Sequence, residues 1–520
     1  MFILITVGIL LLSAFGLLVL RFVSPDFRYT WLLAAGGALT AWISLFLWQI
    51  AMPITVQLPL WQPEIIFRQS PLFVADAISW AIALSIGTIC LGVIITAVAR
   101  ENFPSPVSWI GIFLLTAFGI LAVTAENPLT LVLLWAAIDL SELISQLRFV
   151  EGPKLNERVV FSFASRVAGT LILLWASMVS ASSGSVLNFR SPPPSAGLLL
   201  ILAAGLRLGV LPLHLPYAGE SAFRRGFGTN LRMISAGSSL ILLARIPLSS
   251  VESPITPYLM IFTSFVALYG GWMWLRSPDE LTGRPFWLIG LGSLAVAAAL
   301  RGNAIGATAW SCALILSGGV IFLASAQSRW LERALYAGVW GVSALPFSLT
   351  SNGWINERAS FWYAIPLLLM AQAFLLAGYI RQIQRASTRA TFDDQPIWAR
   401  NVYPFGIYII LFTILLLGFF GWSGSLDIGN WIAGLIASAL TFGLLWLTPR
   451  LRILNPVRAH WVRPTDPNWL DAIYQALWSL YRQIGRISNS FSNVLEGESG
   501  IMWTLLFLVL FISIFIQRAP

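Results

Sequence analysis

Six ionisable residues of this 520-residue chain lie within long apolar stretches, where a charge is expensive. They are Asp139, Glu142, Arg166, Arg207, His214 and Arg232. A charged side chain at bilayer depth is tolerated chiefly when it is paired, so we expect these groups to contact one another. The expected contacts are an Asp139–Arg207 ion pair, with Arg166 near Glu142. Buried carboxylates and a histidine can bind and release protons, which makes this set a candidate proton or ion path.

The composition indicates that these residues belong to a membrane protein. Hydrophobic residues make up 58% of the chain and charged residues only 10%, whereas a soluble domain carries about a quarter charged residues. This balance excludes a disordered chain, a nucleic-acid-binding domain and a disulfide-stapled secreted module. Apolar segments of about 17–25 residues predict about 16 transmembrane helices. The predicted spans are 2–20, 29–50, 74–99, 107–125, 127–147, 159–181, 196–214, 229–248, 256–275, 285–300, 303–325, 334–350, 360–380, 402–422, 430–448 and 500–517.

The basic residues predict the orientation of these spans. Loops after odd-numbered spans hold 22 of the 31 basic residues, the opposite side holds 6, and Arg166, Arg207 and Arg232 lie within spans. The positive-inside rule then places the arginine-rich face in the cytoplasm and both termini on the opposite side. We therefore expect an integral protein of a plasma membrane or another energy-transducing membrane.

Residues 465–495 predict an amphipathic helix outside the spans. Apolar residues recur there at three-to-four spacing, and Arg482 and Arg486 lie among the polar residues of the other face. This pattern is typical of a helix that lies on the membrane surface, here the cytoplasmic one. Such a lateral helix rests either on the protein's own spans or against a partner subunit, and the sequence leaves both open.

Two of the predicted helices, the seventh and the twelfth, are interrupted by proline. Pro212 follows Gly209 near the end of the seventh span, and Pro346 lies near the end of the twelfth. Proline removes a backbone donor and clashes with the preceding turn, so each helix must break or kink there. Broken helices in matching positions of two halves point to an ion or substrate path at a repeat interface. Since the offset of five spans is odd, two such repeats have inverted topology; kinks that serve packing alone are the other interpretation.

Several motifs resemble a known family. The stretch Leu206–Pro216 resembles the broken-helix motif, roughly G-K-S-A-Q-F-P-F-H-x-W-L-P, of the antiporter-like subunits of respiratory complex I and of Mrp cation/proton antiporters. The other segments similar to motifs of that family are Ile234–Gly237 with Leu242–Arg245, Val342–Pro346 with Asn352–Trp354, and Asp76 with Ile78 and Ser79. Together these motifs cover about residues 70–400.

The resemblance implies an all-α polytopic membrane helix bundle of about 16 helices, with two inverted five-helix repeats and broken helices 7 and 12. The expected organisation is three N-terminal helices (1–106), a first antiporter-like repeat of helices 4–8 (107–250), a second, degenerate repeat of helices 9–13 (251–400), and C-terminal helices with the lateral helix (401–520). The expected partners are other membrane subunits of a complex I-like or Mrp-like assembly and the lipid bilayer, without nucleic acid.

The family's proton-carrying residues are replaced at several aligned positions. The family's helix 5 Glu follows a Trp, where this chain has Ala136, although Asp139 and Glu142 follow three and six residues later on roughly the same helical face. The aligned positions of the helix 7 Lys, the helix 8 Lys or His and the helix 11 Lys are Arg207, Thr229 (with Arg232 nearby) and Gly318. Arginine stays charged and cannot hand on a proton as a desolvated lysine can.

These departures divide the chain into two unequal halves. The only lysine, Lys154, lies in a loop, so no lysine relay is possible, and spans 9–13 hold almost no buried charge. We therefore expect an antiporter-like subunit that takes part in ion translocation or its coupling through its first half, with an inactive second half. A structural scaffold whose ion pairs only fix helix packing, and a stand-alone secondary transporter, are the alternatives.

The sequence shows no nucleotide-binding loop and no haem, flavin, iron–sulfur or zinc signature. We therefore expect neither a cofactor nor a metal, and no catalytic residue of the chain's own. If the chain belongs to an NADH:quinone oxidoreductase-like complex, its redox chemistry lies on partner subunits, and whether the chain counts as part of an enzyme stays open.

Overall fold

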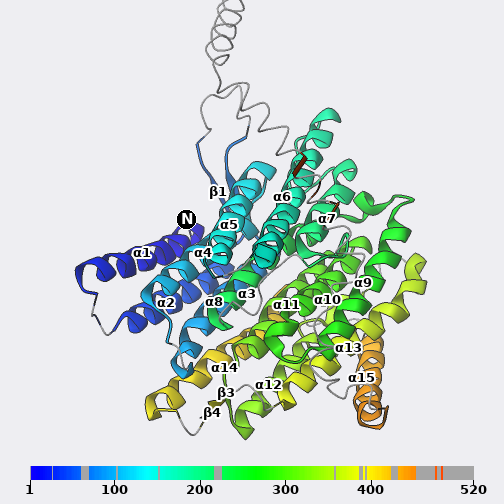
Figure 1. Cartoon of the computed structure of the whole chain (residues 1–520). Coiled ribbons are helices and arrows are strands. Elements are labelled where there is room, and N and C mark those ends of the chain that lie inside the picture. The colour runs from blue at the N-terminus through cyan, green and yellow to red at the C-terminus, as the bar shows by residue number, and fades with distance from the viewer. Residues whose placement is uncertain are drawn as a thin grey trace, which may run out of the picture. The chain divides into compact units, whose positions relative to one another are not determined.

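The computed structural model is a bundle of α-helices with two very small sheets (Figure 1). It describes residues 2–25, 27, 29–59, 69–100, 103–149, 153–215, 225–355, 359–385, 390–392, 395–422 and 431–451, with five separate helical residues between 475 and 483. Contacts divide the chain into two units, Met1–Val457 and Arg458–Pro520. Apart from those five residues, the predicted lateral helix (465–495) and the last predicted span (500–517) lie outside the described residues.

Fifteen α-helices lie within the described residues, at the places of the first fifteen predicted spans. They are α1 (Phe2–Val23), α2 (Thr30–Ala51), α3 (Ala77–Thr96), α4 (Pro106–Thr124), α5 (Pro128–Phe149), α6 (Pro153–Ser182), α7 (Pro194–Leu208), α8 (Arg225–Leu243), α9 (Thr256–Arg276), α10 (Glu280–Leu300), α11 (Ala304–Leu323), α12 (Arg329–Val342), α13 (Ile365–Gln384), α14 (Ile397–Phe420) and α15 (Trp431–Leu451). Within the same residues, 11 helices are long and apolar enough to cross a membrane. The predicted all-α, polytopic membrane fold is confirmed.

The helices begin at residues that suit helix starts. Four consecutive helices, α4 to α7, start with proline, whose missing N–H costs nothing in the first turn. Elsewhere a side-chain oxygen accepts the first free backbone N–H groups: Asp76 caps α3, Asp279 caps α10, Asn303 caps α11 and Ser328 caps α12. These proline and capping residues determine where each helix begins. They therefore also determine how far along the helix its buried charged groups lie.

Both predicted helix breaks are present. Helix α7 ends at Leu208, because Gly209 adopts a left-handed conformation (φ 74°) and Pro212 follows in the turn beyond it. Helix α12 ends at Val342, and the segment with Pro346 is not helical. Each helix is therefore shorter than its predicted span, since the residues beyond the break form turns instead of continuing the helix.

Contacts between loops show that successive helices alternate in direction. Arg245, just after α8, binds Asp76 at the start of α3. Arg225, at the start of α8, binds Glu280 at the start of α10. The antiparallel sheet of β1 (Ile54–Gln57) and β2 (Leu72–Ala75) leads into α3, and the parallel pair of β3 (Ala326–Gln327) and β4 (Ala390–Thr391) follows α11 and α13. We call the end of the bundle that carries β1 and β2, at the top of Figure 1, the β1 end. The opposite end, which carries β3 and β4 at the bottom of Figure 1, is the β3 end.

The same pattern of helix pairing occurs twice along the chain. In α4–α8, contacts join α4 to α5, α5 to α6, α6 to α7, α7 to α8, α4 to α8 and α5 to α8. Each of these pairs recurs in α9–α13 after a shift of five helices. The broken helices run in opposite directions, because α7 starts at the β1 end and α12 starts directly after β3. We call α4–α8 the first helix set and α9–α13 the second helix set.

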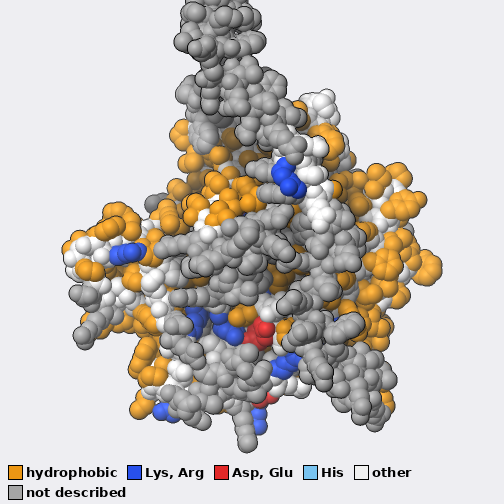
Figure 2. Space-filling view, in the orientation of Figure 1, with side chains coloured by type: hydrophobic (Ala, Val, Ile, Leu, Met, Phe, Trp, Pro, Cys, Tyr) orange, Lys and Arg blue, Asp and Glu red, His pale blue; other side chains and the backbone are white. Residues whose placement is uncertain are grey.

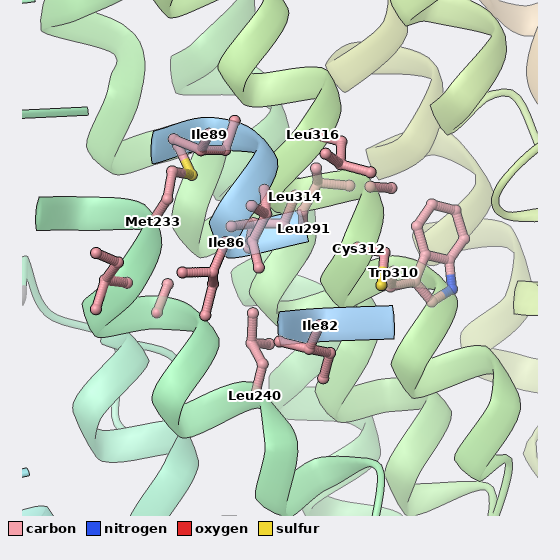
Figure 3. Packing of buried hydrophobic residues seen from close by; sticks show 14 of the residues in the cluster. Ile82, Ile86, Ile89, Met233, Leu240, Leu291, Trp310, Cys312, Leu314 and Leu316 are labelled. Carbon is pink, nitrogen blue, oxygen red and sulfur yellow. The ribbon is translucent and has the colours of Figure 1, made fainter. Parts of the chain in front are cut away.

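The core between the two sets is apolar. Ile82, Ile86 and Ile89 of α3 pack there with Met233 and Leu240 of α8 (Figure 3). Side chains of α10 and α11 complete this cluster, and nearly all residues of these two helices are buried. The few ionisable groups of the neighbouring helices therefore lie in a low-dielectric surrounding, in which charge pairing decides the structure.

The surface separates apolar from basic side chains. On the face in Figure 2, apolar side chains cover much of the described surface, and most of the visible basic side chains lie in its lower half. That half contains the β3 end, where the loops after odd-numbered helices meet. On this face, the visible basic side chains of the described residues therefore lie mostly toward the β3 end.

Helices α9 and α10 approach each other closely at Gly270. A Cβ added at Gly270 would lie 2.7 Å from the backbone nitrogen of Gly290, which cannot move aside, whereas one added at Gly36 of α2 meets nothing within 4 Å. We expect Gly270→Ala to destabilise the protein by about 1–3 kcal/mol, the cost of overpacking. Gly36→Ala is the matched control and should be neutral or slightly stabilising. Thermal unfolding of the two purified variants tests this, and equal unfolding temperatures would contradict the close approach.

Candidate functional site

The candidate site is built on α5. Asp139 is the twelfth residue of the 22 in this helix, which places it near the middle of the span. Glu142 follows three residues later on the same face. Asp139 is 2% exposed and Glu142 is fully buried. Two carboxyl groups thus lie close together at the depth where an unpaired charge is most expensive.

Asp139 is held by two arginines from different helices. Arg207, at the end of α7, donates two parallel hydrogen bonds to it, at 2.6 Å and 2.9 Å. Nε of Arg166, in the middle of α6, lies 3.2 Å from Oδ1 of Asp139. The predicted Asp139–Arg207 pair is therefore confirmed. Its bidentate geometry is the strong form of a carboxylate–guanidinium contact.

Glu142 forms the second half of the same network. Nη1 of Arg166 lies 2.8 Å from its Oε1, which confirms the predicted proximity of these residues. Arg232 of α8 binds the same oxygen, and Gln146, one turn further along α5, donates to it at 2.7 Å. Arg166 therefore bridges the two carboxylates. We call Asp139, Glu142, Arg166, Arg207 and Arg232 the ion-pair cluster.

Arg207 has further contacts that fix its position. Its guanidinium carbon lies 4.1 Å from the centre of the Trp135 ring, a cation–π contact. Its Nε donates to Ser239 of α8 at 3.2 Å, and its Nη1 donates to Thr170 at 3.2 Å. Gly169 leaves the room for this side chain, since a Cβ there would lie 2.6 Å from Cγ of Arg207. The end of α7, next to the helix break, is thus tied to α5, α6 and α8 at once.

The charges of the ion-pair cluster do not balance. Three guanidinium groups face two carboxylates, all between 0% and 2% exposed. Arginine keeps its proton at every physiological pH, so within the cluster only Asp139 and Glu142 can bind or release one. Oε2 of Glu142 is buried and receives no hydrogen bond from the described residues. The cluster can therefore hold buried charges, but its arginines cannot pass protons from one to the next.

His214 lies apart from these hydrogen bonds, beyond the break of α7. Its Nδ1 is 2.9 Å from the carbonyl oxygen of Pro212, and its ring meets that of Phe161 edge to face. Its Nε2 is buried without a hydrogen-bond partner among the described residues. The ring is thus positioned by the break itself.

The second helix set is tightly packed at the position where the resemblance implies a lysine. A Cβ at Gly318 of α11 would lie 2.6 Å from the indole nitrogen of Trp287, 3.1 Å from the Phe322 ring and 3.2 Å from the end of Met233. Trp287 also packs against Tyr379 of α13. Apolar and aromatic atoms therefore fill the space into which a side chain at this position would extend.

One expectation for the second set needs correction. Arg284 is fully buried within α10 and donates to Thr229 of α8 at 3.1 Å, although the sequence places it in a loop. Arg301, at the other end of α10, is 3% exposed and donates to the carbonyl oxygen of Gly353 at 2.9 Å. Helix α10 begins five residues earlier than predicted because Asp279 caps it, and this shift carries Arg284 into the helix. The second set therefore holds buried charge, but at its helix ends.

A smaller group of charges at the β1 end was missed by the sequence analysis. Asp76 caps α3 through Ser79 and binds both Nη atoms of Arg245. Glu126, in the segment between α4 and α5, is 2% exposed and accepts a hydrogen bond from the backbone of Arg190 at 3.0 Å. Asp76 and Arg245 each lie in a segment that resembles the family, but nothing in their spacing along the chain shows that they meet.

The fold is shared with chains of known membrane complexes. A chain of the Mrp complex from Dietzia sp. DQ12-45-1b is 16% identical with a TM-score of 0.72, a match that covers 100% of this chain and 63% of that one. A chain of an archaeal respiratory membrane complex, the membrane-bound sulfane sulfur reductase, is 13% identical with a TM-score of 0.62, covering 98% and 100%. A chain of respiratory complex I from Thermus thermophilus with bound Aureothin is 15% identical with a TM-score of 0.58, covering 79% and 97%.

These likenesses establish the class of fold. The chain is a polytopic helix bundle of the kind found in Mrp and respiratory membrane complexes, and it spans only 63% of the Mrp chain that it matches. No family model matches the sequence, and no curated protein matches it. The fold that the motifs imply is confirmed, and the function is argued below from the site.

The Asp76–Arg245 pair predicts a pH dependence of stability. Burial raises the pKa of Asp76, but the hydrogen bond and charge of Arg245 and the hydrogen bonds from Ser79 hold it below its ordinary value. A lowered native pKa gives stability that is present above the unfolded value, about 3.9, and lost as the pH falls through the native value. The difference in unfolding temperature between the natural chain and Asp76→Asn should therefore shrink below about pH 4. A difference that stays constant from neutral to acidic pH would contradict this.

Glu142 should be the most costly residue of the cluster to neutralise. Glu142→Gln removes the counter-charge that Arg166 and Arg232 share, so two buried guanidinium groups lose their common partner. Breaking a buried pair in this way costs about 3–5 kcal/mol. Glu252→Gln, at an exposed residue after α8, is the control and should change the unfolding free energy by less than about 0.5 kcal/mol. Unfolding measured in lipid or mild detergent decides between these outcomes.

Proposed function

We propose that this chain is an antiporter-like membrane subunit of a complex I-type or Mrp-type assembly. In this proposal its first helix set takes part in proton or ion translocation, or in coupling to it. The observation that supports the proposal is the ion-pair cluster in the middle of α5–α8, directly beside the break of α7. A buried set of charges beside a broken helix is the arrangement that ion-translocating membrane proteins use.

The two helix sets are proposed to be inverted repeats. Each helix pair of the first set recurs in the second after a shift of five helices, and the broken helices run in opposite directions. Residues 107–250 and 251–400 are then the two repeats, with 1–106 and 401–520 as additions at either end.

Charge balance gives the proposed role of each cluster residue. Asp139 and Glu142 are the groups that take up and release a proton, and the arginines set the energy of each charge state. Because Arg166 touches both carboxylates, neutralising either one changes the field at the other. Arg207 lies in the last turn of α7. A change in the charge of Asp139 is therefore transmitted to the helix break and to His214 beyond it. The cluster thus couples charge to the position of a helix end.

The second helix set is proposed not to conduct. Trp287, Phe322 and Met233 occupy the space around Gly318, and the buried charges Arg284 and Arg301 lie near the ends of α10. A continuous ion path needs polar groups or water at each step through the hydrocarbon region. With apolar packing in the middle of the set, translocation by this chain would depend on the first set alone.

The proposed setting is a multi-subunit complex in an energy-transducing membrane. The proteins with this fold come from an Mrp complex and from respiratory complexes. By the positive-inside rule the β3 end lies in the cytoplasm, and partner subunits are other membrane proteins. Redox chemistry, if the complex performs any, is assigned to those partners.

One observation favours a second candidate function, a non-conducting scaffold. Each carboxylate of the cluster contacts two guanidinium groups, and Asp139 is held in bidentate geometry. A network of ion pairs of this kind can simply fix the packing of α5–α8. The two candidates differ in what happens when one charge is removed from an otherwise assembled complex.

Asp139→Asn separates the two candidates. If Asp139 carries protons or sets the charge state of the path, its neutral variant should abolish ion translocation by the complex while the subunits still co-purify. Translocation is measured as pH or sodium gradients in vesicles that contain the intact complex, and Asp139→Glu should restore part of it. Glu252→Gln controls for effects of expression. Full translocation by an assembled Asp139→Asn complex would overturn the proposal and favour the scaffold.

A further inference from the structure

The β1 end holds a second buried carboxyl group that the ion-pair cluster does not include. Glu126 lies between the end of α4 at Thr124 and the start of α5 at Pro128, and it is 2% exposed. Its backbone N–H donates to the carbonyl oxygen of Leu72 in β2 at 3.0 Å. Its Oε1 accepts a hydrogen bond from the backbone of Arg190, and its Oε2 is buried without a partner among the described residues.

Three charged groups from other segments act on Glu126. Asp76 lies at the start of α3, Arg245 follows α8, and Arg190 lies in the segment between α6 and α7. Arg190 is exposed to the surroundings, whereas the side chain of Arg245 is 8% exposed, so Arg245 is the less exposed of the two cations. Arg245 is already engaged by both carboxylate oxygens of Asp76. The buried carboxyl group of Glu126 and the partly exposed carboxylate of Asp76 (side chain 23% exposed) therefore both interact with the guanidinium group of Arg245.

This arrangement of charges has a direct consequence for the protonation of Glu126. With Asp76 ionised, the Asp76–Arg245 pair is neutral. Ionising Glu126 then adds a buried negative charge that, of the groups acting on it, only the exposed Arg190 and the occupied Arg245 can offset. Burial accordingly raises the pKa of Glu126, and the charge of Asp76 raises it further, against the lowering effect of the two arginines. The unpartnered Oε2 is an oxygen that can carry the proton.

We propose that Glu126 is a proton-binding site at the β1 end, and that it exchanges its proton by competing with Asp76 for Arg245. Loss of the proton leaves a carboxylate that draws Arg245 away from Asp76, and gain of the proton returns Arg245 to Asp76. Since Asp76 caps α3 and Arg245 follows α8, this exchange tightens or loosens the contact between these two helices.

Two helices connect this site to the ion-pair cluster. Glu126 precedes α5, which carries Asp139 thirteen residues later, and Arg245 follows α8, which carries Arg232 thirteen residues earlier. Both separations correspond to about 20 Å along a helix axis. Helices α5 and α8 also bind each other in between, where Trp135 donates to the carbonyl oxygen of Ser238 at 3.1 Å. A role in translocation rests on the proposed function, whereas proton binding at Glu126 does not.

Infrared difference spectroscopy on the purified full-length chain in lipid tests proton binding directly. Spectra recorded across a pH titration should contain the C=O stretch of a protonated carboxylic acid that disappears at a pH above about 4.3, the ordinary value for glutamate. This band should be absent from Glu126→Gln and present in Glu252→Gln, the exposed control. Glu126→Asp should keep a titrating band at a shifted midpoint. A spectrum of Glu126→Gln identical to that of the natural chain would overturn the proposal.

A second variant tests the competition for Arg245. In Asp76→Asn the guanidinium group is released to Glu126, so the midpoint of the Glu126 band should move to lower pH. An unchanged midpoint in that variant would overturn the sharing of Arg245. Vesicle transport assays on the same variants keep this inference distinct from the proposed function. If Asp139→Asn stops translocation and the Glu126 band is missing, the inference alone fails; if the band titrates and no variant alters translocation, the proposed function alone fails.

Discussion

The pairing of charges in the middle of the membrane-spanning helices is the constraint on which the rest of this structure depends. Asp139 and Glu142 lie where water cannot solvate them, and each is stable there because guanidinium groups from neighbouring helices reach it. That requirement brings α5, α6, α7 and α8 to fixed distances from one another. It also places the end of α7, and therefore its break, next to the only carboxylates of the cluster.

The replacement of lysine by arginine changes what such a site can do. A lysine shifts its pKa readily on burial and can pass a proton on, whereas arginine stays charged and offers several directed donors. In this chain the guanidinium of Arg207 contacts Asp139, Ser239, Thr170 and Trp135 simultaneously. In the proposed function, proton exchange therefore belongs to the carboxyl groups, and the arginines fix the electrostatic field around them. In the proposed function, the packing of Trp287 around Gly318 restricts this chemistry to the first helix set.

Much of the fold follows from the sequence because hydropathy and capping act locally. The first fifteen predicted spans and both helix breaks could be predicted, since Pro212 and Pro346 interrupt apolar helices whatever surrounds them. The Asp139–Arg207 pair could be predicted because buried charges need partners. The contacts of Arg232 and the meeting of Asp76 with Arg245 could not, because they depend on how helices far apart in the chain pack. Arg284 was misplaced because the cap at Asp279 lengthens α10 beyond its apolar core.

The most direct test of the central claim is a double-mutant cycle on Asp139 and Arg207. The free energy of unfolding of the chain in lipid is measured for Asp139→Asn, for Arg207→Gln and for both changes together. If charge pairing organises the first helix set, each single variant leaves a buried group without its partner, and the double variant should be clearly more stable than the sum of the two losses predicts. Strictly additive losses would contradict the account.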